Sequence, residues 1–187
     1  MKAYTSNNIR NIAVLGHGGK GKTTLCEAML YLAGATDRLG KVADGNTVLD
    51  FDAEEKRRKS SVSSAMAAIE WDNTKLNIID APGLFDFESG AAEAVRAAEA
   101  VLIVTSAGSG VDVGTEKAFK AAEKRGLAKF FAITKTDSDH RSFYKTFEAL
   151  KEVYGNKLCP TIIPYMEGNI TKSYVNLMTG MAYEYDE

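Results

Sequence analysis

The chain has 187 residues, of which 45% are hydrophobic and 26% are charged, and its formal net charge is −2. This length suits a single domain with an ordinary apolar core, and the slightly negative charge argues against autonomous DNA binding. With two cysteines, no signal peptide and no membrane-length apolar run, we expect a cytoplasmic, monomeric chain with no membrane contact.

The first predicted strand, residues 9–15, leads into a glycine-rich loop. Its sequence GHGGKGKTT (residues 16–24) fits the phosphate-binding pattern G-x-x-x-x-G-K-[ST]. A loop without Cβ atoms can turn its backbone N–H groups around phosphate oxygens, and the N-terminus of a following helix adds a favourable dipole. Lys22 would reach the β- and γ-phosphates, and the Thr23 hydroxyl would ligate Mg²⁺. The alternative is a helix-capping loop that binds nothing, which the strand before it and the helix predicted over residues 22–33 disfavour.

Residues 34–61 are polar and weakly periodic, which predicts a long loop that is functional or mobile. Its basic run KRRK (residues 56–59) has two interpretations. It could contact RNA phosphates. Alternatively, it is the solvated face of a mobile loop, balanced by Asp50, Asp52, Glu54 and Glu55.

The remaining chain alternates between strand-like and helix-like segments. Residues 63–71 and 75–81 predict a hairpin, followed by a helix at 89–98, a strand at 101–106, a helix at 115–125 and a strand at 130–134. A helix that Asp139 can cap, carrying Phe143, Phe147, Leu150 and Tyr154, then precedes a last strand at 161–165. This order predicts an α/β fold with a mostly parallel sheet, helices on both faces and one antiparallel hairpin. Ligands of such sheets bind at the carboxyl ends of the strands.

Two such ends carry candidate nucleotide contacts. In DAPG (residues 80–83), Asp80 would hold Mg²⁺ through water, and the N–H of Gly83 would meet a γ-phosphate. In TKTD (residues 134–137), the Asp137 carboxylate can accept hydrogen bonds from N1–H and N2–H₂ of guanine, while the Lys135 stem lies along the purine. A plain Pro-Gly turn and a solvated turn are the respective alternatives.

In this order, the phosphate loop, DAPG and TKTD resemble the first, third and fourth motifs of a GTPase. Residues 52–87 resemble the second motif and the following strands of translational GTPases, most of all elongation factor G and its divergent paralogues. The resemblance covers residues 9–185 and implies a P-loop NTPase G domain that binds GTP or GDP with Mg²⁺ and acts on the ribosome in translocation or a related step. It further implies a G-domain core at residues 1–164 without the fifth motif, and the start of an insertion at residues 165–187, as in a piece of a larger protein.

The resemblance assigns roles to individual residues. The implied nucleotide contacts are Gly16, His17, Gly18, Gly19, Lys20, Gly21, Lys22, Thr23, Thr24, Asp80, Ala81, Pro82, Gly83, Thr134, Lys135 and Asp137. The implied metal ligands are Thr23, Ser61 and Asp80, with Ser61 in place of the switch I threonine. The implied catalytic positions are Lys22, Gly83 and Leu84.

The sequence also departs from the family pattern. Leu84 stands where elongation factor G has the histidine that orients the attacking water, and leucine cannot hydrogen-bond water. His17 and His140 are interpreted as ordinary polar positions, not replacements. Thr134 replaces the guanine-motif asparagine, and Gly19 replaces a phosphate-loop aspartate. We therefore expect slow intrinsic hydrolysis.

Two other functions remain open. A partition-type ATPase has a similar phosphate loop, but its signature lysine would fall at His17, and TKTD would have no role there. A nucleotide-dependent binding module with little turnover would be consistent with Leu84.

Overall fold

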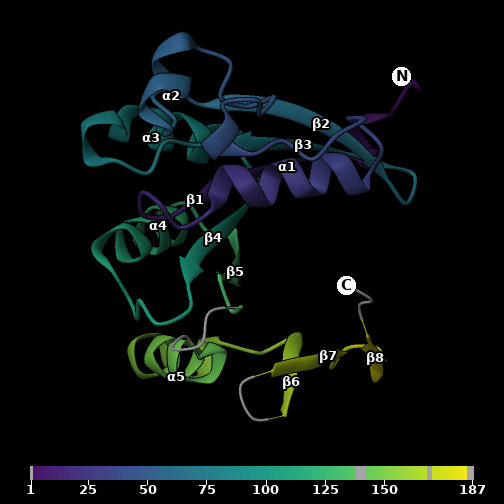
Figure 1. Ribbon diagram of the computed structural model, residues 1–187, viewed down its shortest axis with the longest axis vertical. Coiled ribbons are helices and arrows are strands. Elements are labelled where there is room, and N and C mark those ends of the chain that lie inside the picture. The colour runs from purple at the N-terminus through teal and green to yellow at the C-terminus, as the bar shows by residue number, and fades with distance from the viewer. Residues whose placement is uncertain (1, 138–141, 168–169, 185–187) are drawn as a thin grey trace. The chain divides into compact units, whose positions relative to one another are not determined.

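The computed structural model describes residues 2–137, 142–167 and 170–184. The chain divides into two compact units (Figure 1). The first contains the chain up to Thr105 and the stretch Asp112–Ala132, and the second contains Ser106–Val111 and the chain from Ile133 on. No helix among the described residues is long and apolar enough to cross a membrane.

A five-stranded sheet in the order β2-β3-β1-β4-β5 organises the nucleotide-site motifs. Its strands are β1 (Ile9–Leu15), β2 (Ala65–Trp71), β3 (Thr74–Asp80), β4 (Ala100–Ser106) and β5 (Ala128–Thr134). β1 runs parallel to β3 and β4, while β2 and β3 form an antiparallel hairpin. Its turn places Asp72 and Asn73 at φ 44° and 57°, as a two-residue type I′ turn requires. The predicted α/β fold with one antiparallel hairpin is confirmed.

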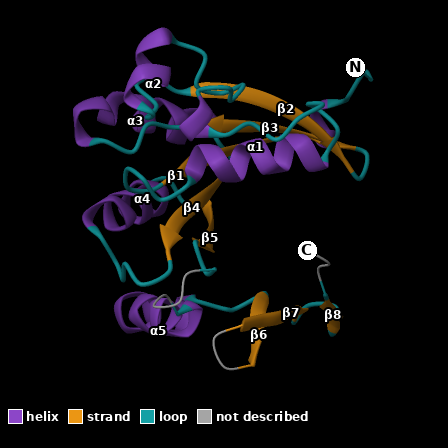
Figure 2. Ribbon diagram, in the orientation of Figure 1, coloured by secondary structure: helices purple, strands orange, loops and turns teal. Residues whose placement is uncertain are grey.

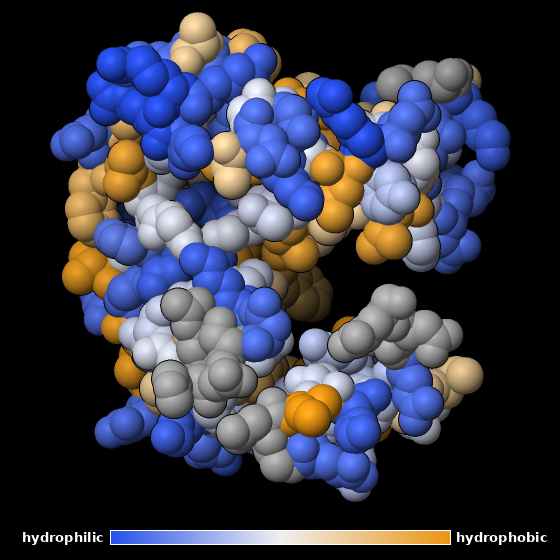
Figure 3. All heavy atoms as spheres, in the orientation of Figure 1, coloured by the Kyte–Doolittle hydropathy of each residue, from blue (hydrophilic) through white to orange (hydrophobic). Residues whose placement is uncertain are grey.

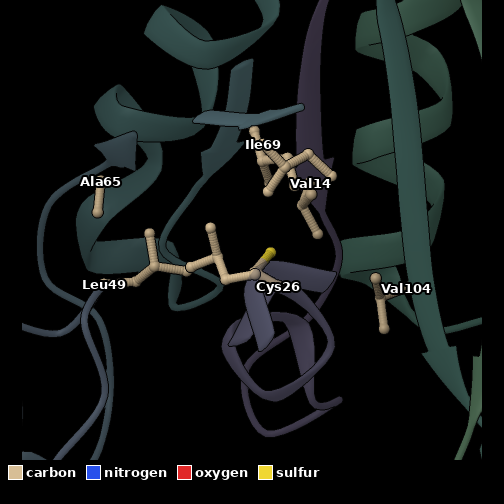
Figure 4. Close-up of a cluster of buried hydrophobic side chains, with 8 residues drawn as sticks. Val14, Cys26, Leu49, Ala65, Ile69 and Val104 are labelled. Carbon is tan, nitrogen blue, oxygen red and sulfur yellow. The ribbon is translucent and has the colours of Figure 1, made fainter. Parts of the chain in front are cut away.

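Helices cover both faces of this sheet. They are α1 (Lys22–Leu32), α3 (Glu88–Ala97) and α4 (Val113–Lys124), shown in purple in Figure 2. Val14 packs with Cys26 and Leu30 of α1 in a buried cluster. Because successive strand residues point to opposite faces, Leu15 faces the other way, toward Val95 of α3. Figure 4 shows side chains of the α1 cluster, among them Val14, Cys26, Leu49, Ala65, Ile69 and Val104.

The segment between α1 and β2 differs from the predicted structureless loop. It contains α2 (Ala53–Arg58), which begins with a capping box formed by Asp52 and Glu55. The buried Glu55 carboxylate also accepts hydrogen bonds from the N–H groups of Val62 (2.9 Å) and Ser63 (3.1 Å). This local capping signal, D-x-x-E, overrides the weak apolar periodicity of the segment.

The second unit holds α5 (Phe143–Tyr154), capped by Ser142, and an antiparallel sheet of β6 (Ile162–Glu167), β7 (Ile170–Asn176) and β8 (Met181–Tyr183). The strand predicted at 161–165 therefore does not join the parallel sheet as expected. It pairs with β7, which follows it closely in the chain, and an apolar pattern does not specify a pairing partner. The expected division at residue 164 falls within β6, and it stays a prediction.

Candidate nucleotide-binding site

The phosphate loop leaves the end of β1 and enters α1. Gly16 has φ 138°, and a Cβ atom there would collide with the backbone carbonyl of Val104. Gly21 precedes α1 in the left-handed conformation, at φ 89°. Both positions require glycine, because one lies too close to β4 for a side chain and the other has a backbone conformation that side chains disfavour.

Lys22 points back into the loop that it follows. Its Nζ donates hydrogen bonds of 3.1 Å to the carbonyl oxygens of both Gly16 and His17. The side chain is buried, and burial lowers the pKa of its ammonium group, while the negative charge of Asp80 opposes that effect. The structure thus directs a cation into the loop, as binding of phosphate oxygens would require.

Three predicted metal ligands converge beside α1. The Thr23 hydroxyl donates a 2.7 Å hydrogen bond to Oδ2 of Asp80, and its oxygen lies 3.2 Å from the Ser61 hydroxyl. Ser61 in turn donates a 2.7 Å hydrogen bond to Oδ1 of Asp50. Each hydroxyl has one proton, and each proton is directed to a carboxylate. The two hydroxyl oxygens consequently face each other with lone pairs, as two ligands of one cation do.

The carboxylates of this cluster are buried with little compensating charge. Burial raises the pKa of Asp80 to about 6, although the Thr23 hydrogen bond and Lys22 oppose the rise. Burial also raises the pKa of Asp50. Oδ1 of Asp80 is buried and has no hydrogen-bond partner among the described residues. A free carboxylate oxygen beside two hydroxyl oxygens fits Mg²⁺, a hard cation that prefers oxygen ligands and keeps several waters.

DAPG crosses the phosphate loop at the end of β3. A Cβ atom on Gly83 would collide with Nζ of Lys22 and would approach the Gly18 backbone nitrogen to 2.7 Å. The next residue, Leu84, lies over the same loop, because a Cβ on Gly18 would come within 2.9 Å of its Cδ2 atom. The structure thus brings the predicted catalytic positions Lys22, Gly83 and Leu84 together.

Three further predicted nucleotide contacts, His17, Ala81 and Thr24, differ in burial and in hydrogen bonding. The His17 ring lies 5.4 Å from that of Phe85, and its Nδ1 atom is buried without a hydrogen-bond partner among the described residues. Ala81 donates a backbone hydrogen bond of 3.2 Å to Val14, and Thr24 is exposed. His140 and the expected helix cap Asp139 lie outside the described residues.

The guanine motif belongs to the second unit. Thr134 ends β5, and its carbonyl oxygen accepts a 2.8 Å hydrogen bond from the Ala107 N–H. Lys135 adopts a left-handed conformation at φ 56°, and both Lys135 and Asp137 are exposed. The exposed carboxylate of Asp137 is therefore accessible, as base recognition by this residue would require.

Sequence reasoning missed three acidic residues around the phosphate loop. Asp50 fixes Ser61, and Glu27 of α1 accepts hydrogen bonds from the N–H groups of Val48 (2.8 Å) and Leu49 (3.1 Å). Asp112, which caps α4, forms a 3.1 Å ion pair with Lys20 of the loop. All three contacts join residues far apart in the chain. Only the capping role of Asp112, three residues before Thr115, has a local signal.

The acidic residues near the basic run on α2 differ in their contacts. Arg57 and Arg58 both pair with Glu54, whereas Asp50 and Glu55 are buried and accept hydrogen bonds from Ser61 and from the backbone of Val62 and Ser63. Deep blue, strongly hydrophilic atoms gather over α2 in Figure 3. Both interpretations of the run, contact with RNA phosphates and a solvated face balanced by these acids, stay predictions.

This sheet, loop and cluster define a P-loop nucleotide-binding domain of the G-domain class. Comparison with known proteins then gives the family, because residues 7–185 match the model of the elongation factor Tu GTP binding domain. The chain belongs to this family of translational GTPases, whose members hydrolyse GTP. The partition-type ATPase alternative is thereby excluded.

Individual relatives agree with this assignment. The elongation factor G-like protein of Mycobacterium tuberculosis is 34% identical over 95% of this chain and 24% of its own length. The mitochondrial ribosome-releasing factor 2 of Debaryomyces hansenii is 35% identical over 89% of this chain and 19% of its own. A crystal structure of a Thermus thermophilus protein has a TM-score of 0.89 and 37% identity, covering 95% of this chain and 27% of that one. The chain thus spans about a quarter of the length of these relatives.

Proposed function

We propose that this chain is the G domain of an elongation-factor-G-like translation factor, which binds GTP with Mg²⁺ and hydrolyses it in a ribosome-coupled step such as translocation. The convergence of Thr23, Ser61 and Asp80 supports this proposal, because three oxygen-bearing side chains of the kind that Mg²⁺ prefers lie together beside the phosphate loop. The names of the relatives support a step on the ribosome.

The residues have distinct roles in this proposal. The loop amides and Lys22 bind the phosphates, while Thr23, Ser61 and Asp80 hold Mg²⁺. Bound Mg²⁺ supplies positive charge against the β- and γ-phosphate oxygens. Asp137 selects guanine, and Thr134 and Lys135 form the rest of that contact.

Hydrolysis additionally needs a water held in line with the γ-phosphate by a group that can share its proton. Leu84 occupies the position that the family gives to such a group, and an alkyl side chain can only exclude water. We therefore propose that turnover of the chain alone is slow. A nucleotide-dependent binding module with little turnover is the second candidate, and the contact between Leu84 and Gly18 favours it.

The proposal also covers the domain boundaries, the oligomeric state and the cellular location. Residues 1–164 form the G-domain core and residues 165–187 belong to an insertion within it. The chain alone is monomeric, and the protein is cytoplasmic.

Nucleotide titration tests the proposal. We expect fluorescent GDP and GTP to bind the purified protein and ATP not to compete with them. Removal of Mg²⁺ by EDTA should lower the affinity for GTP. Single-turnover hydrolysis with and without ribosomes then separates a working GTPase from a binding module. Competition by ATP equal to that by GDP would contradict guanine selection.

A further inference from the structure

An apolar cavity of about 120 Å³ lies beside Leu84. Its walls include Leu15 of β1, Val95 of α3 and Ala118 and Ala121 of α4, while Leu84 itself forms part of the lining. The alanine side chains are too short to fill the space between the two helices. The cavity is consequently an apolar space within reach of the residue that covers the phosphate loop.

Charged residues in the lining are already compensated. Lys117 pairs with Glu88 at 3.1 Å, and its ammonium lies 4.6 Å above the Phe85 ring. Neither charge requires a polar ligand in the cavity. The chemistry of the lining therefore favours an apolar occupant.

The present position of Gly83 and Leu84 competes with a γ-phosphate. Gly83 lies against Lys22 Nζ and the Gly18 nitrogen, and Leu84 covers Gly18. These are donors that a γ-phosphate would use, so we expect its entry to move Gly83 and Leu84 from their present positions. Gly83 can absorb the backbone change, because glycine has access to more φ values than other residues.

We propose that Leu84 is a displaceable plug, which leaves Gly18 and enters this cavity when GTP occupies the site. The proposal rests on the GTP binding proposed above. Engineered apolar cavities of about 150 Å³ hold benzene, so a cavity of this size admits the four carbons of a leucine side chain. Leu84 is 38% exposed where it now lies, so entering the cavity would remove apolar surface from water.

Displacement would change what the leucine does in the reaction. Over Gly18, it excludes water from the phosphate loop. In the cavity, it leaves that face open to a water and to a proton-sharing group supplied from elsewhere. The chain could then hydrolyse GTP without a histidine at this position, but only in the displaced state.

Methyl NMR tests the displacement directly. In the protein with labelled leucine and alanine methyls, we expect Leu84 to show contacts to Gly18 with GDP. With a non-hydrolysable GTP analogue, we expect contacts to the methyls of Ala118 and Ala121 instead. Binding of the analogue is measured on the same samples. Absence of binding would contradict the proposed function, whereas binding with Leu84 still on Gly18 would overturn the plug.

A filled cavity provides a second test. Ala121→Leu should occupy the space and hold Leu84 over the loop. We expect this variant to slow single-turnover GTP hydrolysis on ribosomes by about fivefold to a hundredfold, because the usual cost of overpacking would oppose entry of Leu84 into the cavity. The affinity for GDP should not change. Ala97→Leu, on an exposed part of α3 outside the cavity, is the matched control and should have no effect.

The double variant makes this test specific. In a Leu84→Ala background nothing needs to enter the cavity, so Ala121→Leu should no longer slow the reaction. An equal loss in both backgrounds would overturn the proposal. A third outcome would also overturn the proposal. If added benzene fills the cavity while Leu84 stays over Gly18 in the presence of the GTP analogue, the cavity binds small apolar ligands and does not receive Leu84.

Discussion

Ser61 donates a 2.7 Å hydrogen bond to Asp50, while its oxygen lies 3.2 Å from the hydroxyl of Thr23. The bond to Asp50 fixes the direction of the only hydroxyl proton of Ser61. The lone pairs of Ser61 therefore point toward the cluster that we propose for Mg²⁺. If Ser61 binds Mg²⁺ as proposed, Asp50 would act on the cation through Ser61, without itself being one of the predicted ligands.

Removing Asp50 should weaken Mg²⁺ binding. We expect Asp50→Ala to raise the Mg²⁺ concentration needed for tight GTP binding by about 10-fold to 100-fold, the usual effect of losing a group that orients a metal ligand. Dissociation of fluorescent GTP, followed over a Mg²⁺ series, measures this. Asp44→Ala, an exposed acid of the same segment, is the control. Equal Mg²⁺ dependence in both variants would mean that Asp50 does not orient a ligand.

The Asp50–Ser61 contact also illustrates which features the sequence could not predict. The phosphate loop and the β2–β3 hairpin have local patterns, so their sequence positions suffice to predict them. Asp50 in a polar segment looks like any solvated acid, because its partner is set by how the segment packs on α1. The same holds for Glu27, whose partners Val48 and Leu49 follow an irregular stretch of chain.

The second sheet has a related explanation. Residues 161–165 have the apolar composition of a strand, and that composition fits a parallel or an antiparallel neighbour equally. The structure pairs β6 with β7, the strand that follows it most closely. α2, by contrast, was predictable from the capping residues Asp52 and Glu55, and apolar periodicity was the wrong signal to follow there.

Asp80 should make stability depend on pH when no divalent cation is present. Burial raises its pKa from 3.8 to about 6, so the folded protein holds this proton more tightly than the unfolded chain. The stabilisation that the bound proton provides is fully present below about pH 4 and is lost as the pH rises through about 6. Its loss lowers the free energy of unfolding by about 3 kcal/mol. We expect Asp80→Asn to be more stable than the unmutated protein at pH 7.5, with little difference at about pH 4.

Denaturant unfolding with EDTA at the two pH values measures this difference, with Asp44→Asn as the exposed control. Mg²⁺ binding should show the opposite preference, weakening as pH falls through about 6, because the proton and the cation compete for one carboxylate. A stability difference that is independent of pH would show that Asp80 does not titrate in this range.

Glu27 should stabilise the segment before α2. Its Oε1 atom accepts hydrogen bonds from two backbone N–H groups, and the side chain is fully buried. Glu27→Ala should orphan those groups at a cost of about 1–3 kcal/mol each. Hydrogen exchange should show Val48 and Leu49 losing protection before the sheet does. Glu93→Ala, an exposed glutamate on α3, should leave both measurements unchanged.

Asp137 should determine the choice of base. Asp137→Asn replaces an acceptor of two guanine N–H groups by an amide, and we expect GDP affinity to fall by about 1.5–3 kcal/mol for each bond weakened. Xanthine nucleotides should gain affinity, since xanthine offers a carbonyl to the new amide. Competition titrations with GDP and xanthosine diphosphate measure both effects, and Asp72→Asn in the hairpin turn is the control. Loss of both nucleotides together would indicate a damaged fold instead.

Leu84→His should increase GTP hydrolysis without changing GDP affinity. The unmutated leucine can cover the phosphate loop but cannot accept a proton from water, whereas Lys22, Thr23 and Asp80, the proposed phosphate and Mg²⁺ contacts, are not changed by the substitution. A positioned acid–base group contributes about 10²–10⁴-fold. Single-turnover hydrolysis on ribosomes is the measurement, with Leu84→Gln as a polar variant that has no basic nitrogen. A gain with histidine alone indicates proton transfer, while equal gains with both variants indicate that removing the leucine is sufficient. If neither variant exceeds the unmutated protein, then the group that orients the water comes from outside this chain, and Leu84 is no defect.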